Sequence, residues 1–162
     1  MSAHKKVALI IMDGWGHTQD TEHNAIHQAH TPFFDHAWNT YPHTLLEASG
    51  LAVGLPEGQM GNSEIGHTTI GAGSSIDTDI VVIEKSIRDG SFFTNTAFLQ
   101  LVEHTKKHNS KIHMIGLLSD GGVHSHNTHI YAFLKFAEQQ GLHKEQVVLH
   151  IFTDGRDTAP KT

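Results

Sequence analysis

Lys111-Ile-His-Met-Ile-Gly-Leu-Leu118 is an apolar run of strand length that leads into a polar, glycine-containing loop. Residues 146–153 form a second run of this kind, and a similar polar loop follows it. Between the two runs, residues 126–140 have the apolar spacing of a helix, which Gly141 is expected to terminate. Alternation of strand, helix and strand predicts an α/β fold with a mostly parallel sheet and flanking helices.

The rest of the chain continues this alternation. Residues 7–12 are apolar at every position and predict a strand that is buried on both faces of a sheet. A short second strand is expected over residues 44–48. Helices are predicted to begin at Thr31-Pro32 and after Asn62-Ser63, and to cover residues 77–88 and 94–108. The glycine- and serine-rich stretch 71–75 is the expected linker, which divides the chain into segments 1–75 and 76–162.

The composition limits the class of protein. The chain has 162 residues, of which 38% are hydrophobic and 17% charged, as in ordinary globular domains. Because no run of about 18 apolar residues occurs, no transmembrane helix and no membrane partner is expected. A net charge of −6 argues against a nucleic-acid partner. The absence of cysteine excludes disulfides, thiolate zinc sites and thiol nucleophiles, and it is typical of the reducing cytoplasm.

Asp13 and Ser63 are the first two candidate site residues. Asp13 directly follows the run 7–12, where a carboxylate can serve as a metal ligand or a general base; the alternative is an ordinary Asp-Gly turn. Ser63 opens a predicted helix, whose free N–H groups and dipole favour anions, which suits a nucleophile that accepts a phosphoryl group. The alternative is a serine that only caps the helix. Acyl-transfer chemistry is not indicated, because the chain has no Gly-x-Ser-x-Gly motif.

The loops after residues 111–118 and 146–153 supply three further candidates. Arg156 offers a planar fork for a phosphate or carboxylate, Asp157 can accept a hydrogen bond from a hydroxyl, and His124 can donate one to a phosphate oxygen. A small, anionic, hydroxylated substrate fits this set; the alternative is a pair of polar turns that cap the next helices. Because parallel strands end at one edge, we expect the three side chains to meet near one anion-sized pocket.

Four long motifs occur in order along the chain. They are Val7-Ala-Leu-Ile-Ile-Met-Asp-Gly-Trp-Gly16, Gly54-Leu-Pro-Glu-Gly-Gln-Met-Gly-Asn-Ser-Glu-Ile-Gly-His67, Leu118-Ser-Asp-Gly-Gly-Val-His-Ser-His126 and Phe152-Thr-Asp-Gly-Arg-Asp-Thr158. Through these motifs the chain resembles the cofactor-independent (2,3-bisphosphoglycerate-independent) phosphoglycerate mutases of the alkaline phosphatase superfamily. The resemblance implies interconversion of 2-phosphoglycerate and 3-phosphoglycerate in glycolysis and gluconeogenesis, through a phosphoserine intermediate and without 2,3-bisphosphoglycerate.

The resemblance also assigns roles to the candidates. It implies that the site holds two divalent metal ions, usually Mn²⁺, and that Asp13 is a ligand of one of them. Ser63 is implied to be the nucleophile and to contact the same ion, and His124, Arg156 and Asp157 are implied to bind the phosphoglycerate substrate. Segment 1–75 resembles the N-terminal part of the family's metal-binding phosphatase-like domain. Segment 76–162 resembles the N-terminal part of its inserted phosphotransferase domain.

Members of this family are much longer than 162 residues, and the metal ligands from their C-terminal segment have no counterpart here. We therefore expect this chain alone to be inactive as a mutase. We also expect the region before Ser75 either to be completed by another polypeptide segment or to expose an apolar patch and self-associate. Two alternatives stay open: a metal-dependent phosphatase of the same superfamily, and an inactive remnant of the enzyme.

Overall fold

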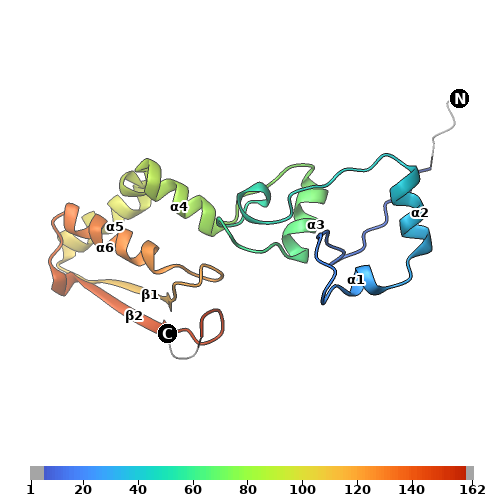
Figure 1. Ribbon diagram of the computed structural model, residues 1–162. Coiled ribbons are helices and arrows are strands. Elements are labelled where there is room, and N and C mark those ends of the chain that lie inside the picture. The colour runs from blue at the N-terminus through green and yellow to red at the C-terminus, as the bar shows by residue number, and fades with distance from the viewer. Residues whose placement is uncertain (1–5, 160–162) are drawn as a thin grey trace, which may run out of the picture.

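The computed structural model describes residues 6–159. In this range the chain forms six α-helices, three short 3₁₀ helices and two strands. The helices are α1 (Ala25–Gln28), α2 (Pro32–Thr40), α3 (Ser63–Ala72), α4 (Asp79–Asp89), α5 (Thr96–His108) and α6 (Asn127–Gln139), the strands are β1 (Ile112–Leu118) and β2 (Val147–Thr153), and the 3₁₀ helices are η1 (Gly50–Val53), η2 (Ser91–Thr94) and η3 (Lys144–Gln146). Figure 1 shows α1–α3 toward one end of an elongated molecule and the sheet with α4–α6 at the other.

Strands β1 and β2 form a two-stranded parallel sheet, which confirms the predicted α/β class. Their register pairs Ile112 with Val147 at one end and Leu118 with Thr153 at the other. Helix α6 makes the crossover between them, as parallel strands require. Both strands therefore end at the same edge of the sheet, and the loops that follow them start side by side.

The hydrophobic core lies between this sheet and the helices on one of its faces. Phe136 of α6 is completely buried, and Phe133, Val102 of α5 and Ile112 of β1 pack in the same cluster. Burial of each large apolar side chain contributes about 1.5–3 kcal/mol, so this cluster dominates the stability of the fold. The opposite face of the sheet is open, and Ile115 is 70% exposed.

Local hydrogen bonds explain where the predicted helices begin and end. The Asn95 side chain accepts the N–H groups of Ala97 and Phe98 at the start of α5. Asn109 ends this helix in the left-handed conformation, with φ 47°. The helices expected from Thr31-Pro32, after Asn62-Ser63, over 77–88, over 94–108 and over 126–140 are all present, with ends that differ from the prediction by at most two residues.

The expected strands over residues 7–12 and 44–48 are not formed, and both segments are irregular. A strand needs a partner for its backbone N–H and C=O groups, and β1 and β2, which pair with each other, are the only strands in residues 6–159. The side chains of residues 7–12 are consequently open to solvent; Val7 is 90% and Ile10 82% exposed. The region before Ser75 thus exposes apolar side chains, while its self-association, or its completion by another polypeptide segment, stays a prediction.

The total accessible surface also shows that the chain as a whole is less compact than a typical monomer of its mass. It is 12,731 Å², whereas a compact monomer of this mass exposes about 8,000 Å². The core lies in η2, α5, β1, α6 and the turn that follows α6, whereas most residues from 6 to 49 are exposed. No helix in the described range is long and apolar enough to cross a membrane.

The expected linker at 71–75 is partly helical and is followed by a close contact between the two parts of the chain. Residues 71 and 72 belong to α3. The N–H of Thr78 donates to the carbonyl oxygen of Gly54 over 2.8 Å, and a Cβ at Gly54 would lie only 1.9 Å from the carbonyl oxygen of Ile76. Leu55 and Val81 are buried beside this contact, with 4% and 1% exposure. The η1 region is thus packed onto the start of α4.

Removal of the central aromatic ring should destabilise the chain strongly. Phe136→Ala is expected to lower the free energy of unfolding by about 3–5 kcal/mol, because it leaves a cavity in the core. The matched control is Phe33→Ala, which removes a ring that is 90% exposed and should change stability by less than about 0.5 kcal/mol. Urea denaturation of both variants measures this difference, and equal effects would contradict the placement of the core.

The exposed run 7–12 should make the 162-residue polypeptide self-associate. Ile10→Asp should reduce association, because it places a charge in the apolar patch at little cost to folding. Gln19→Asp adds the same charge at an exposed polar position and serves as the control. Sedimentation velocity gives the measurement. A monodisperse 17.8 kDa monomer with strong amide protection over residues 7–12 would show that the prediction is wrong.

Candidate active site

Ser63 and Asp13 lie fifty residues apart in the sequence and are in direct contact. Asn62 caps helix α3 by accepting the N–H of Ile65 over 3.0 Å, which makes Ser63 the first helical residue. The Ser63 hydroxyl donates a hydrogen bond of 2.6 Å to Oδ2 of Asp13. Asp13 sits in a turn beside Gly14, which has a φ of 78°. The structure therefore brings together the two residues for which the sequence predicts a nucleophile and a metal ligand, and both are exposed to solvent.

His67 is a third member of this group, and the sequence analysis gave it no role. It lies four residues after Ser63, on the same face of α3. Its Nδ1 is 2.8 Å from the carbonyl oxygen of Ser63 and 3.3 Å from the hydroxyl oxygen. Because a carbonyl oxygen only accepts, Nδ1 carries the proton in this contact. Asp13, rather than His67, is then the acceptor for the Ser63 proton.

The donor set of Asp13 and Ser63 fits part of a divalent cation site. A carboxylate and a hydroxyl are the hard oxygen ligands that ions such as Mg²⁺ and Mn²⁺ prefer. Such ions take about six ligands, and residues 6–159 contain no group of three or more His, Asp or Glu side chains placed to hold a metal. Asp13 and Ser63 could therefore contribute two ligands to a site whose other ligands must come from elsewhere.

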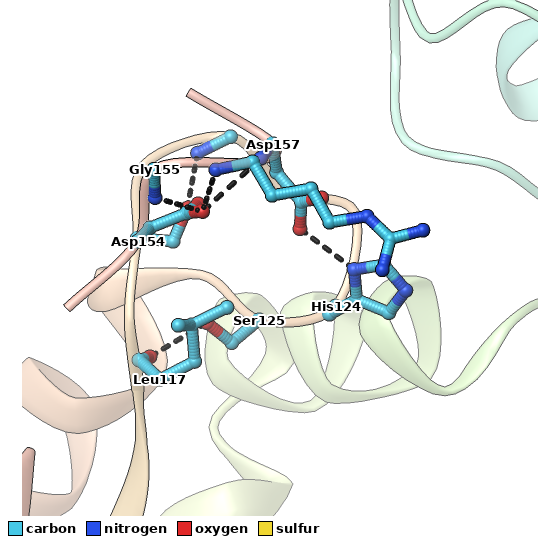
Figure 2. Close-up of polar contacts among 9 residues, drawn as sticks. Leu117, His124, Ser125, Asp154, Gly155 and Asp157 are labelled. Atoms are coloured by element: carbon cyan, nitrogen blue, oxygen red, sulfur yellow. Dashed lines mark hydrogen bonds and ion pairs between the residues drawn. The ribbon is translucent and has the colours of Figure 1, made fainter. Parts of the chain in front are cut away.

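His124 and Asp157 form the second candidate group. Nδ1 of His124 lies 2.7 Å from Oδ2 of Asp157, as Figure 2 shows. The Asp157 side chain is only 7% exposed, whereas that of His124 is 64% exposed. The imidazole thus presents its free edge to solvent while the carboxylate fixes its orientation. Arg156 precedes Asp157 in the same loop and is exposed.

Asp154 organises the loop that carries Arg156 and Asp157. Its Oδ1 accepts the N–H groups of Gly155, Arg156 and Asp157 over 2.6, 2.9 and 3.1 Å, respectively (Figure 2). Its Oδ2 accepts the hydroxyl of Ser119, over 2.5 Å. The Ser119 hydroxyl, followed by the backbone N–H groups, holds the pKa of Asp154 well below its usual range. Sequence reasoning missed both residues, although alignment of the runs 111–118 and 146–153 places position 119 opposite position 154.

Two cavities lie between the loop that precedes Ser63 and the loop that carries His124. A cavity of about 670 Å³ is lined by residues 56–59 on one side and by parts of α4 and residues 120–122 on the other. A second, of about 310 Å³, is lined by Gln59 and His124 among others. Arg156 and Asp157 line neither of them. The structure shows a direct contact between His124 and Asp157, and the place of Arg156 in a shared anion pocket stays a prediction.

The fold and these groups define an α/β protein with polar candidate sites at a helix start and at the carboxyl edge of a parallel sheet. Residues 83–162 match the family described as "BPG-independent PGAM N-terminus". The chain is 52% identical over 160 residues to the 2,3-bisphosphoglycerate-independent phosphoglycerate mutase of Salinibacter ruber, covering 99% of this chain and 31% of that protein. It is 53% identical over 159 residues to that of Hydrogenovibrio crunogenus, covering 98% and 30%.

A solved structure agrees with these sequence relatives. The crystal structure of Leishmania mexicana phosphoglycerate mutase at low cobalt concentration is 37% identical, with a TM-score of 0.64 over 93% of this chain and 27% of that one. Over almost all of its residues the chain is therefore similar to the N-terminal part of the 2,3-bisphosphoglycerate-independent phosphoglycerate mutases. It spans about 30% of the length of the relatives it matches.

Proposed function

We propose that this chain supplies the serine nucleophile and part of the substrate site of a phosphoglycerate mutase, which interconverts 2-phosphoglycerate and 3-phosphoglycerate. The observation that carries the proposal is the hydrogen bond from Ser63 to Asp13, at the N-terminus of a ten-residue helix. The proposal is also supported by the roughly 50% identity of this chain to phosphoglycerate mutases over almost all of its residues. The full-length protein is a protein of the same length as these relatives that contains the present 162 residues.

In the first half-reaction, the Ser63 oxygen forms a bond to the phosphorus of the bound phosphoglycerate. The bond between phosphorus and the glycerate oxygen breaks, and that oxygen takes up the proton that Ser63 loses, so that it becomes a hydroxyl of glycerate. In the second half, the other hydroxyl of glycerate attacks the phosphoserine, and Ser63 is regenerated. The chain favours these steps because the N-terminus of α3 presents the positive end of the helix dipole to the phosphoryl oxygens.

Asp13 orients the nucleophile. Its carboxylate accepts the Ser63 proton in a hydrogen bond, which directs a lone pair of the serine oxygen away from Asp13. We propose that Asp13 and Ser63 are also ligands of a divalent cation, with Mn²⁺ as the expected metal; cobalt is named for the Leishmania mexicana structure. Such an ion would supply a lowered serine pKa and charge neutralisation at the transferring group.

His124, Arg156 and Asp157 are proposed to hold the substrate. The exposed edge of His124 can donate a hydrogen bond to an anionic oxygen while Asp157 keeps the ring in place. The exposed Arg156 offers a bidentate donor pair to a carboxylate or phosphate. Glycerate has to stay bound between the two half-reactions. The site therefore needs residues that bind its carboxylate in addition to those that bind the phosphoryl group. We propose that the protein acts in the cytoplasm, where glycolysis takes place, and the absence of cysteine from its sequence supports this.

A phosphatase of the same superfamily is the second candidate, and one observation favours it. Ser63 and Asp13 are both exposed, so water has access to a phosphoserine formed at this position. The two functions differ in product: a phosphatase releases inorganic phosphate, whereas a mutase transfers the phosphoryl group back to glycerate.

Loss of the serine oxygen should abolish the reaction. In the full-length protein, Ser63→Ala is expected to reduce mutase turnover by more than about a thousandfold, as for removal of other nucleophiles. The fold should survive, because the cap of α3 is Asn62 rather than Ser63. Ser74→Ala, an exposed serine just after α3, is the control and should leave turnover unchanged. Turnover of Ser63→Ala within tenfold of wild type would exclude the nucleophile role. Release of inorganic phosphate by the wild-type protein, instead of formation of 2-phosphoglycerate from 3-phosphoglycerate, would favour the phosphatase.

The polypeptide of residues 1–162 should by itself show no mutase turnover, with or without added Mn²⁺. The reason is that Asp13 and Ser63 offer only two ligands, and no group of three metal-ligating side chains occurs among residues 6–159. A coupled assay with 3-phosphoglycerate measures the rate, and calorimetric titration with Mn²⁺ measures ion binding. A manganese-dependent rate from polypeptide free of longer contaminants would contradict this prediction.

A further inference from the structure

A partly buried polar contact joins the loop of His124 to the loop of Asp157, and the proposed reaction assigns it no role. Ser119 is only 5% exposed. Its hydroxyl donates to Oδ2 of Asp154 over 2.5 Å and accepts the N–H of Gly121 over 3.0 Å. The same carboxylate accepts three consecutive N–H groups, at positions 155–157, of the other loop. A single serine–aspartate pair therefore holds the backbone of both loops.

The two loops have little room to move relative to each other. A Cβ at Gly121 would lie 3.1 Å from Cγ2 of Thr158 and 3.2 Å from Cβ of Asp157, so the backbone at 121 is packed against the second loop. The Asp157 carboxylate then reaches Nδ1 of His124 over 2.7 Å. Because the N–H of Asp157 is itself held by Asp154, the position of this carboxylate depends on the Ser119–Asp154 contact.

We propose that Ser119 and Asp154 are positioning residues of the substrate site. They act through Asp157 and His124, whose place relative to each other they fix, and they need not touch the substrate. The inference rests on the proposed function for its kinetic consequence, but the structural part of it, the joining of the two loops, stands independently. A group misplaced by about 1 Å can reduce the rate of a reaction by up to about a hundredfold, which sets the scale of the effect.

The kinetic test uses the full-length protein with 3-phosphoglycerate as substrate. Asp154→Ala and Ser119→Ala should each raise KM by about tenfold or more and change kcat much less, because they loosen groups that hold the substrate throughout the reaction. The KM of the double variant should exceed the higher of the two single-variant KM values by no more than threefold, because both changes break the same contact. Asp154→Asn keeps an oxygen for the N–H groups at 155–157 and should restore part of the loss.

Asp89→Ala is the matched control. Asp89 lies at the end of α4 and accepts the N–H of Ser91 over 2.8 Å, so it is also an aspartate that stabilises a turn, outside the two loops. This variant should stay within twofold of wild type in KM and kcat. Ser86→Ala is the corresponding control for Ser119, since Ser86 donates to a backbone carbonyl within α4.

Amide hydrogen exchange of the same proteins provides the readout that does not depend on activity. Asp154→Ala and Ser119→Ala should both speed exchange at residues 155–157 and 121–124, while β1 stays protected. Should the wild type fail to interconvert phosphoglycerates, the proposed function is wrong and exchange alone decides the positioning role. Should Asp154→Ala not fold, Asp154→Asn and Ser119→Ala carry the test. Unchanged exchange in both loops, KM values within twofold of wild type, or fully additive losses would each overturn the proposal.

Discussion

The parallel pairing of β1 with β2 is the constraint on which the second half of the molecule depends. The register from Ile112–Val147 to Leu118–Thr153 places the ends of both strands at one edge of the sheet. The loops after them therefore start at neighbouring positions, and this adjacency allows Ser119 to meet Asp154 and His124 to meet Asp157. The helices that bury Phe136 cover one face and hold the pair of strands together, so the core and the candidate substrate site share one support.

The difference between correct and incorrect strand predictions has a physical cause. The runs 111–118, 146–153 and 7–12 have similar local patterns, but only the first two find partners, in each other. A local pattern states which conformation a segment prefers, while pairing and burial decide whether the segment adopts it. Helix ends were predictable to within a few residues because their signals, such as Asn62 before α3 and Gly90 after α4, act over a few residues.

The candidate site was predictable as a set of residues but not as a set of contacts. Motif order pointed to Asp13, Ser63, His124, Arg156 and Asp157, whereas the hydrogen bonds among them depend on tertiary structure. Asp154 and Ser119 escaped notice because an aspartate and a serine in polar turns are common and carry no periodic signal. Only the alignment of the two strands turns them into neighbours. His67 escaped for a related reason, because helical spacing from Ser63 matters only once the helix is known to start at that residue.

The contact between Asp13 and Ser63 has a consequence for the order in which the molecule folds. It closes a loop of fifty residues, and the segments inside this loop add little to the core, so the entropy of closure is offset by few other contacts. The part from η2 to β2 relies on more local contacts and should form first. For a ligand that bridges Asp13 and Ser63, part of the binding free energy would then be offset by the cost of ordering the chain between them. Its apparent affinity would report the stability of that segment as well as the chemistry of the two oxygen atoms.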